Sequence, residues 1–312
     1  MGAFRDDFIN DPGTPHMFDS KQERARLSLE GLSVGDAFGQ QFFHPGVVET
    51  ATPHNLPVPP WNCTDDTEMA MAIVQVLEEH EEIDQDTLAR TFAERFAADP
   101  YRGYGAGARM LLESIRDGAD WRTENCKMFG GQGSFGNGGA MRVAPLGGWY
   151  ADNIDATIEQ ARRSALVTHT HHEGVVGTIA VALAAGWAAR RAASGRNTPP
   201  EEMLPWVISH LEPSEVRSRL EWASTYELDT WQFTVASQVG CGEQITAQDT
   251  VPFCLWLAAS RIDDYPDAMW TAARVGGDID TNCAIIGGIL ALSVGWEGIP
   301  EDWRRYRERL SW

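Results

Sequence analysis

Two acidic stretches carry the residue types that could perform chemistry, and more than two hundred residues separate them along the chain. Thr64-Asp65-Asp66 leads into the apolar run 69–77, and Gly277-Asp278-Ile279-Asp280-Thr281 leads into the apolar run 283–294. Each run is long enough for a buried helix, so both sets of carboxylates crowd a helix start. One Asp or Thr there is ordinary capping. Two such clusters indicate that the carboxylates have a role beyond helix capping.

A cation would explain the repetition. If the two helix starts face each other, at least four carboxylates share one small site. At an effective dielectric near 20, each close pair repels by about 4 kcal/mol, whereas a helix dipole stabilises each acid by about 1 kcal/mol. Capping cannot sustain such a cluster, but a bound divalent cation can. The sequence therefore predicts a metal site between the two acidic stretches.

A third stretch, 133–142, is rich in glycine and ends in Met141 and Arg142. Successive glycines let backbone N–H groups converge on an anion, and Arg142 could add a charge-assisted contact. A plain glycine-rich turn explains the stretch equally well. It matches neither a P-loop nor a dinucleotide-binding fingerprint, since it lacks the Gly-Lys-Ser/Thr of the first and the preceding strand of the second.

Three histidines lie together at 169, 171 and 172. A zinc protease pattern would need another histidine at 176, which is Val176. We therefore interpret the segment as a polar helix start with Glu173 in its first turn, where one histidine contacts a ligand. The loop 101–107 combines aromatic residues with glycines. It could border a nucleotide pocket, but its sequence favours a plain turn.

Composition limits the partners. The net charge is −20, which argues against a nucleic-acid surface or an anionic membrane as partner. The five cysteines are scattered without C-x-x-C spacing, which indicates reduced thiols. The N-terminus lacks a signal-peptide pattern, and no segment reads as long and apolar enough to span a bilayer. We expect a soluble, cytoplasmic protein.

The periodicity predicts an all-α fold in one domain over 19–312, after an irregular lead-in over 1–18. Helices are expected at about 66–80, 86–98, 104–117, 155–166, 173–194, 200–209, 214–224, 250–260, 265–274, 282–294 and 301–310, besides one that starts near Lys21 with an Asp19-Ser20 cap. Residues 44–62 contain five prolines and are predicted to form a long loop. Gly31, Gly35 and Gly39 recur every four residues on the first helix, which favours close approach of another backbone.

Taken together, these stretches resemble the ADP-ribosylglycohydrolase family. The similarity runs from about Leu27 to Leu292, with GLSVGDAFG at 31–39, TDDTEM at 64–69, GSFGNGGAMR at 133–142, TH at 168–169 and GGDIDT at 276–281 in the family's order. Each motif alone has only modest specificity for the family, whereas the ordered set is highly specific.

The resemblance implies a compact helical domain with a central cleft that holds two divalent ions, usually Mg²⁺ and sometimes Mn²⁺. By motif, the implied metal ligands are Thr64, Asp65, Asp66, Asp278, Asp280 and Thr281. The implied substrate-binding residues are Ser134, Gly136, Asn137, Gly138, Gly139, Met141 and His169. The implied partner is an ADP-ribosylated protein or ADP-ribosyl-amino acid, with ADP-ribose as product.

One departure concerns the base. Several family members have a glutamate at the position of Phe43, and the next acid here is Glu49. The base is then Asp65, Asp66 or a metal-bound water, and an arginine-linked substrate is favoured over a serine-linked one. The expected reaction is magnesium-dependent hydrolysis of the glycosidic bond at C1 of the distal ribose. A non-catalytic ADP-ribose-binding or crystallin-like protein, and a hydrolase of other phosphate esters, are the alternatives.

Overall fold

The computed structural model describes residues 20–311 and contains helices but no strand in that part of the chain. The α-helices are α1 Lys21–Gln40, α2 Val47–Thr50, α3 Asp65–His80, α4 Gln85–Ala98, α5 Ala106–Arg116, α6 Trp121–Asn125, α7 Ala144–Trp149, α8 Ile154–Leu166, α9 His172–Ala193, α10 Met203–Ser209, α11 Glu215–Ala223, α12 Gln232–Val239, α13 Ala247–Ser260, α14 Tyr265–Val275, α15 Ile279–Val294 and α16 Glu301–Tyr306. Short 3-10 helices lie at Gln41–Phe43, Met128–Gly131, Asn137–Gly139, Pro200–Glu202 and Trp296–Gly298. The all-α prediction is confirmed.

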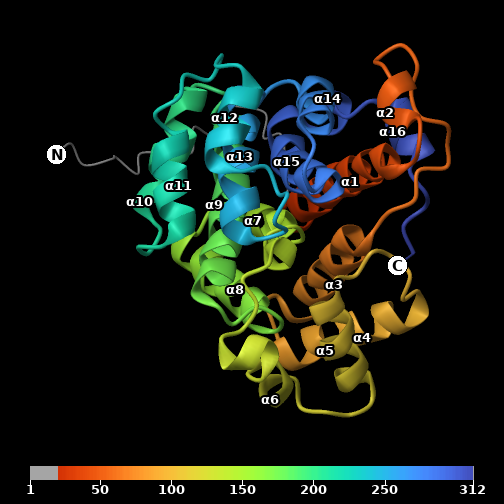
Figure 1. Ribbon diagram of the computed structural model, residues 1–312. Coiled ribbons are helices and arrows are strands. Elements are labelled where there is room, and N and C mark those ends of the chain that lie inside the picture. The colour runs from red at the N-terminus through yellow and green to blue at the C-terminus, as the bar shows by residue number, and fades with distance from the viewer. Residues whose placement is uncertain (1–19, 312) are drawn as a thin grey trace.

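Helices α1 and α15 lie against each other at the centre of the fold (Figure 1). A Cβ on Gly31 would come within 2.5 Å of the Gly287 carbonyl oxygen. One on Gly35 would lie 2.2 Å from the carbonyl oxygen of Cys283. The two backbones therefore touch where α1 has no side chain, and the close approach predicted from the glycine spacing is confirmed.

Helix α9 is a second central element. By length and hydropathy it could cross a membrane, contrary to the expectation that no segment is long and apolar enough, and it is the one such helix among the described residues. In the fold, 89% of its apolar window is buried. It packs against α7, α8, α13 and α15, so its apolar residues form protein core.

The loop between α1 and α3 is fixed by aromatic packing. Trp61 is fully buried, with its ring 5.6 Å from Phe38 of α1 and 5.7 Å from Trp303 of α16. Phe38 stacks on Trp303 at 4.5 Å. The proline-rich segment thus ends on a rigid anchor three residues before the first acidic stretch, and that anchor sets where α3 begins.

Most long helices agree with the sequence prediction within a few residues. Ser20 caps α1 by accepting a hydrogen bond from the Glu23 amide, whereas Asp19 and the lead-in 1–18 lie outside the described residues. The predicted helix 301–310 ends at Tyr306, because residues 307–311 extend to contact other segments. Four short helices, α2, α6, α7 and α12, were not predicted. Each has too few residues for a periodic pattern, and α7 contains a proline and two glycines.

The α1–α15 contact yields a test of the packing. We expect Gly35→Ala to lower the free energy of unfolding by about 2–3 kcal/mol, because the added methyl overlaps a backbone carbonyl that cannot rotate away. Gly107→Ala on α5 is the control, since its methyl would meet only the flexible ends of Met128 and Phe129 at 3.2–3.3 Å. Urea unfolding of both variants measures the difference. Equal stabilities would show that α1 and α15 are not packed this closely.

Candidate active site

Three aspartates from three helices meet at the centre of the molecule. Ligand atoms of Asp36 on α1, Asp66 on α3 and Asp280 on α15 all lie within 4.8 Å of one another. The two acidic helix starts predicted from the sequence therefore do face each other. Asp36 is the member that sequence reasoning missed. It lies in the GDAFG motif, and its signal is a lone acid in an apolar stretch of α1.

Asp36 anchors α3 to α1. Its side chain is fully buried, and its Oδ2 atom accepts hydrogen bonds from the amides of Thr64 at 2.9 Å and Thr67 at 3.3 Å. The Thr64 hydroxyl lies 2.8 Å from Asp36 Oδ1 and 3.0 Å from Asp66 Oδ2. Thr64, which caps α3, therefore lies between two carboxylates and has a single proton for both. The start of α3 is fixed by this network.

The cluster fits a hard divalent cation. Asp66 Oδ1 is buried and accepts no hydrogen bond from any described residue. Burial raises the pKa of Asp66 well above its ordinary value, and the charges of Asp36 and Asp280 raise it further. Burial also raises the pKa of Asp36 to about 6. The cluster offers only oxygen atoms as ligands. Oxygen ligands suit Mg²⁺, Mn²⁺ or Ca²⁺ better than they suit zinc, which prefers nitrogen and sulfur ligands.

Further acids surround this cluster. Asp65 lies at the wall of the cavity, where burial and then the charge of Asp36 raise its pKa to about 7. Asp278 caps α15 by position but makes no capping hydrogen bond with its side chain. Its Oδ2 atom instead accepts a hydrogen bond of 2.7 Å from the Asn137 amide group, which also contacts Thr250 at 3.1 Å. Asn137 thus joins the acidic end of the site to the glycine-rich loop.

The glycine-rich loop forms the other end of the site, and some of its amides already have partners. The Gly136 amide donates to Ser134 Oγ at 3.2 Å, and the Asn137 amide donates to the Ile245 carbonyl at 3.3 Å. These two amides are therefore not free to bind an anion. Side chains must therefore supply part of the hydrogen bonding to an anion that the sequence assigned to backbone amides.

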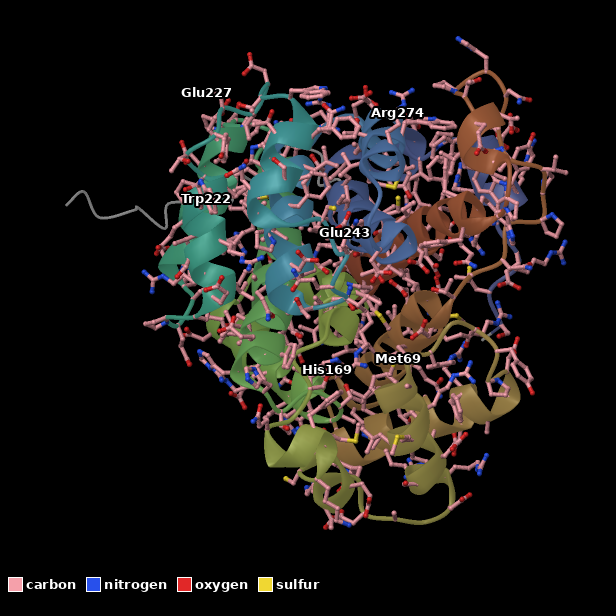
Figure 2. All side chains as sticks on the ribbon, in the orientation of Figure 1. Met69, His169, Trp222, Glu227, Glu243 and Arg274 are labelled. Atoms are coloured by element: carbon pink, nitrogen blue, oxygen red, sulfur yellow. The ribbon has the colours of Figure 1, made fainter. Side chains whose placement is uncertain are left out.

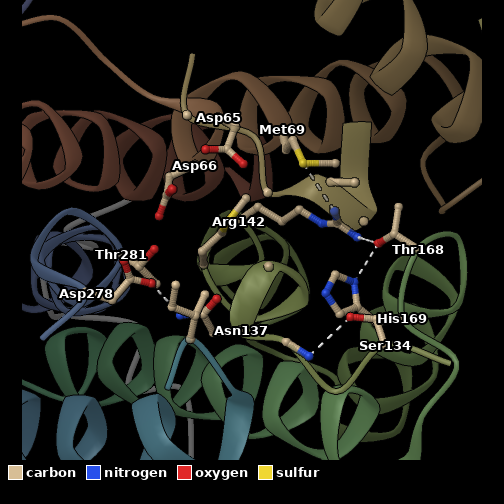
Figure 3. A pocket seen from close by; sticks show the side chains of 18 of the residues that line it. Asp65, Asp66, Met69, Ser134, Asn137, Arg142, Thr168, His169, Asp278 and Thr281 are labelled. Carbon is tan, nitrogen blue, oxygen red and sulfur yellow. Dashed lines mark hydrogen bonds between the residues drawn. The ribbon is translucent and has the colours of Figure 1, made fainter. Parts of the chain in front are cut away.

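Both ends open into one cavity of about 290 Å³. Figure 2 labels two of the residues that line it, Met69 and His169, in the whole molecule, and Figure 3 draws residues that line it from close by. Met69 of α3 and His169 face it from its two sides. Phe129 lines the cavity and is half exposed, and its ring centroid lies 6.4 Å from that of Phe135, which is one-third exposed. The loop 101–107, for which a plain turn was favoured, contributes Gly103, Gly105 and Gly107 to the lining, so it does border the pocket.

Most residues predicted for the site line this cavity. They are Asp65, Asp66, Ser134, Gly136, Asn137, Gly138, Met141, His169, Asp278, Asp280 and Thr281. Thr64 lies behind them, bonded to Asp36 and Asp66. Gly139 is not among the lining residues, because its Cα faces α9, where a Cβ would lie 2.3 Å from Thr178 Oγ1. His171 and His172 do not line the cavity, and His171 caps α9 through Nδ1.

Comparison with known proteins agrees with this geometry. The family model for ADP-ribosylglycohydrolase matches residues 17–312. The chain belongs to the ADP-ribosylglycohydrolase family. It is 32% identical to human ADP-ribosylhydrolase ARH3 over 275 residues, which cover 78% of this chain and 73% of that one. It is also similar to ADP-ribosylarginine hydrolase Tri1 of Pseudomonas putida (strain GB-1), with 25% identity over 93% of this chain and 75% of that one.

A solved structure, described as an ADP-ribosylglycohydrolase-related protein complex, superposes with a TM-score of 0.66. It is 27% identical and covers 93% of this chain and 94% of its own. As an ADP-ribosylglycohydrolase, the protein is a hydrolase acting on ADP-ribosylated substrates, in a family that depends on metal. Phe43, where several members have a glutamate, is half exposed and does not line the cavity, and neither does Glu49.

The C-terminal segment braces the acidic stretch of this ADP-ribosylglycohydrolase. Glu308 Oε1 accepts a hydrogen bond of 2.7 Å from the Cys63 amide, and the Glu308 carboxylate pairs with Arg102. Arg102 donates to the Cys63 carbonyl at 2.9 Å, and its own carbonyl accepts from the Asp65 amide at 2.7 Å. Arg102 and Glu308 together hold the backbone on both sides of Thr64.

Glu308→Ala tests this brace. It leaves the Cys63 amide without its acceptor and removes one of the carboxylates that Arg102 pairs with, another being Asp99. This loss should cost about 1–3 kcal/mol of stability. We also expect the affinity for a divalent cation, with Mg²⁺ as the probe, to fall several-fold, because the start of α3 loses a fixed position. Isothermal titration and urea unfolding measure the two effects. Glu301→Ala, which removes an exposed ion pair with Arg305, is the matched control and should change neither.

Asp280→Asn tests the repulsion in the cluster. Burial, followed by the charges of Asp278 and Asp36, raises the pKa of Asp280 well above its ordinary value. A raised pKa in the fold means that ionisation costs stability, so the cost is absent at low pH and grows as pH rises from about 4. In chelator, Asp280→Asn should therefore melt at or above the parent temperature, and its advantage should be larger at pH 8 than at pH 5.

The control for that variant is Glu159→Gln, an exposed residue of α8 whose loss changes the net charge equally. Thermal melts of the three proteins in chelator decide the matter. If Asp280→Asn melts well below the metal-free parent at pH 8, the carboxylates do not repel one another and the cluster needs no cation.

Proposed function

We propose that this ADP-ribosylglycohydrolase removes ADP-ribose from arginine side chains, using magnesium, by cleaving the glycosidic bond at C1 of the distal ribose. The observation that carries the proposal is that one cavity joins an oxygen-only acidic cluster to a glycine-rich loop through Asn137. The acidic end suits a cation and the ribose, and the loop end suits a diphosphate.

Two Mg²⁺ ions would be held by oxygen atoms of the acidic residues. The proposed ligands are Asp36, Thr64, Asp65, Asp66, Asp278, Asp280 and Thr281. When bound, the metal supplies positive charge that offsets carboxylate repulsion and polarises ligand oxygens. Mn²⁺ is the natural alternative, because it accepts the same donors.

Hydrolysis transfers the ribose from nitrogen to water. Water attacks C1 as the C1–N bond breaks, the bonding electrons pass to the guanidine nitrogen, and that nitrogen takes up a proton. The attacking water loses a proton to a carboxylate, for which Asp65 and Asp66 are the candidates. The cavity carboxylates stabilise the positive charge that develops on the ribose, since Asp65, Asp66, Asp278 and Asp280 all face the same space.

The loop end would bind the rest of ADP-ribose. His169 would face the diphosphate from one side, and the buried Arg142 is also among the residues that line the cavity. This placement matters in a protein of net charge −20, because it supplies positive potential where the substrate carries negative charge. One exposed ring of the Phe129–Phe135 pair can stack on the adenine.

Three observations support the arginine linkage. The position of the glutamate found in several members is Phe43, so every carboxylate that lines the cavity among the described residues belongs to an aspartate. A relative along 93% of the chain is named an ADP-ribosylarginine hydrolase. An acidic cavity also attracts a guanidinium group. We further propose that the protein acts in the cytoplasm, since all five cysteines are free.

Release of free ADP-ribose from an arginine-ADP-ribosylated protein tests the proposal. We expect release with magnesium, none with chelator, and a loss of at least a hundredfold in kcat for Asp66→Asn, with Glu159→Gln as the unaffected control. Release from serine adducts alone would overturn the linkage. Binding of ADP-ribose without release from any adduct would favour a non-catalytic binding protein, and turnover of simple phosphate esters a different hydrolase.

A further inference from the structure

A buried chain of hydrogen bonds leads from Arg142 to the histidine of the cavity (Figure 3). Arg142 is fully buried and donates through Nη2 to Thr168 Oγ1 at 2.7 Å and to the Ser164 carbonyl at 3.3 Å. Its guanidinium also lies 4.4 Å from the ring centroid of Phe92. The Thr168 hydroxyl then lies 2.7 Å from His169 Nδ1. All three residues of this chain are less than a tenth exposed.

Counting protons decides the direction of each bond. A guanidinium can only donate, so the Thr168 oxygen accepts from Arg142. If His169 Nδ1 also donated to that oxygen, the Thr168 proton would be left buried without a partner. Leaving such a group unpaired costs about 1–3 kcal/mol. The arrangement that satisfies every group has Thr168 donating to an unprotonated Nδ1.

We infer that Thr168 and Arg142 are positioning residues that hold His169 in the tautomer protonated at Nε2, so that the ring donates a hydrogen bond into the cavity. The Nε2 atom faces the glycine-rich loop. Positions that a Cβ would take on Gly138 and Gly136 lie 3.2 and 3.5 Å from it. In this part of the loop the amides of Gly136 and Asn137 already donate to protein acceptors. His169 Nε2 therefore supplies a hydrogen-bond donor that these two amides do not.

The Nε2–H donor selects a ligand atom that accepts a hydrogen bond, such as an oxygen. We identify this atom as a diphosphate oxygen on the basis of the proposed function. The assignment of the tautomer does not depend on that function. The opposite tautomer would aim a lone pair at the same oxygen and repel it. Burial, together with the Arg142 charge, lowers the pKa of His169 to about 3, so the ring stays neutral and its tautomer decides the sign of the contact.

The experiment compares Thr168→Val with Thr168→Ser. Proton–nitrogen correlation spectra of the ¹⁵N-histidine-labelled, ligand-free protein should show His169 protonated at Nε2 in the parent and in Thr168→Ser. In Thr168→Val the hydroxyl is gone, and Nδ1 should become protonated in a substantial share of molecules. The dissociation constant for ADP-ribose should rise at least tenfold in Thr168→Val and stay within about threefold in Thr168→Ser. Melting curves show whether each variant is folded.

A second pair keeps the test decisive if Thr168→Val fails to fold. His169→Gln places an amide donor near the Nε2 position, and His169→Asn places one near Nδ1. We expect the glutamine variant to keep most of the ADP-ribose affinity and the asparagine variant to lose it. An Nδ1-protonated parent, or equal affinities for these two variants, overturns the inference. A parent that binds no ADP-ribose overturns the proposed function but leaves the spectroscopic result valid.

Discussion

The close contact of α1 with α15 is the constraint on which the site depends. Gly31 and Gly35 remove side chains from the interface, and the Tyr265 hydroxyl donates to the Gly31 carbonyl at 2.6 Å to hold it. Because the two backbones touch, Asp36 on one helix comes within 4.8 Å of Asp280 on the other. A bulkier interface would separate the two carboxylates by the width of a side chain. Gly31 and Gly35 do not line the cavity, but they set the distance between Asp36 and Asp280.

Charge is distributed unevenly across the cavity. One end concentrates aspartates whose burial and mutual repulsion raise their pKa values. The other end has the fully buried Arg142, which donates hydrogen bonds to Ser164 and Thr168 and interacts with the charge of Asp65. Each arrangement costs folding free energy when considered alone. Their separation suits a substrate that is anionic at its diphosphate and acquires positive charge at its ribose during reaction. The same buried charges that lower the folding stability of the free protein are thus placed to bind this substrate.

Strain occurs at the loop that supports the glycine-rich segment. Ile245, at the cavity wall, has φ of +55°, a conformation that β-branched residues rarely adopt. It is held there because its amide donates to the Gly242 carbonyl and its own carbonyl accepts from the Asn137 amide. The Ala247 amide donates to the Phe135 carbonyl at 2.9 Å, so the two loops are tied on both sides. Such strain is of order 1–3 kcal/mol and fixes one shape of the cavity.

The sequence by itself determined the fold class, the long helices, the close approach at the glycines and the meeting of two acidic helix starts. Each follows from local periodicity or from the energy of like charges. Tertiary structure alone decided that Asp36 joins the cluster, that Gly139 faces Thr178 and that the loop 101–107 lines the pocket. A residue's neighbours across the fold are set by packing between helices distant in the chain. The direction in which His169 donates likewise depends on Arg142 and Thr168, whose contact only the folded chain creates.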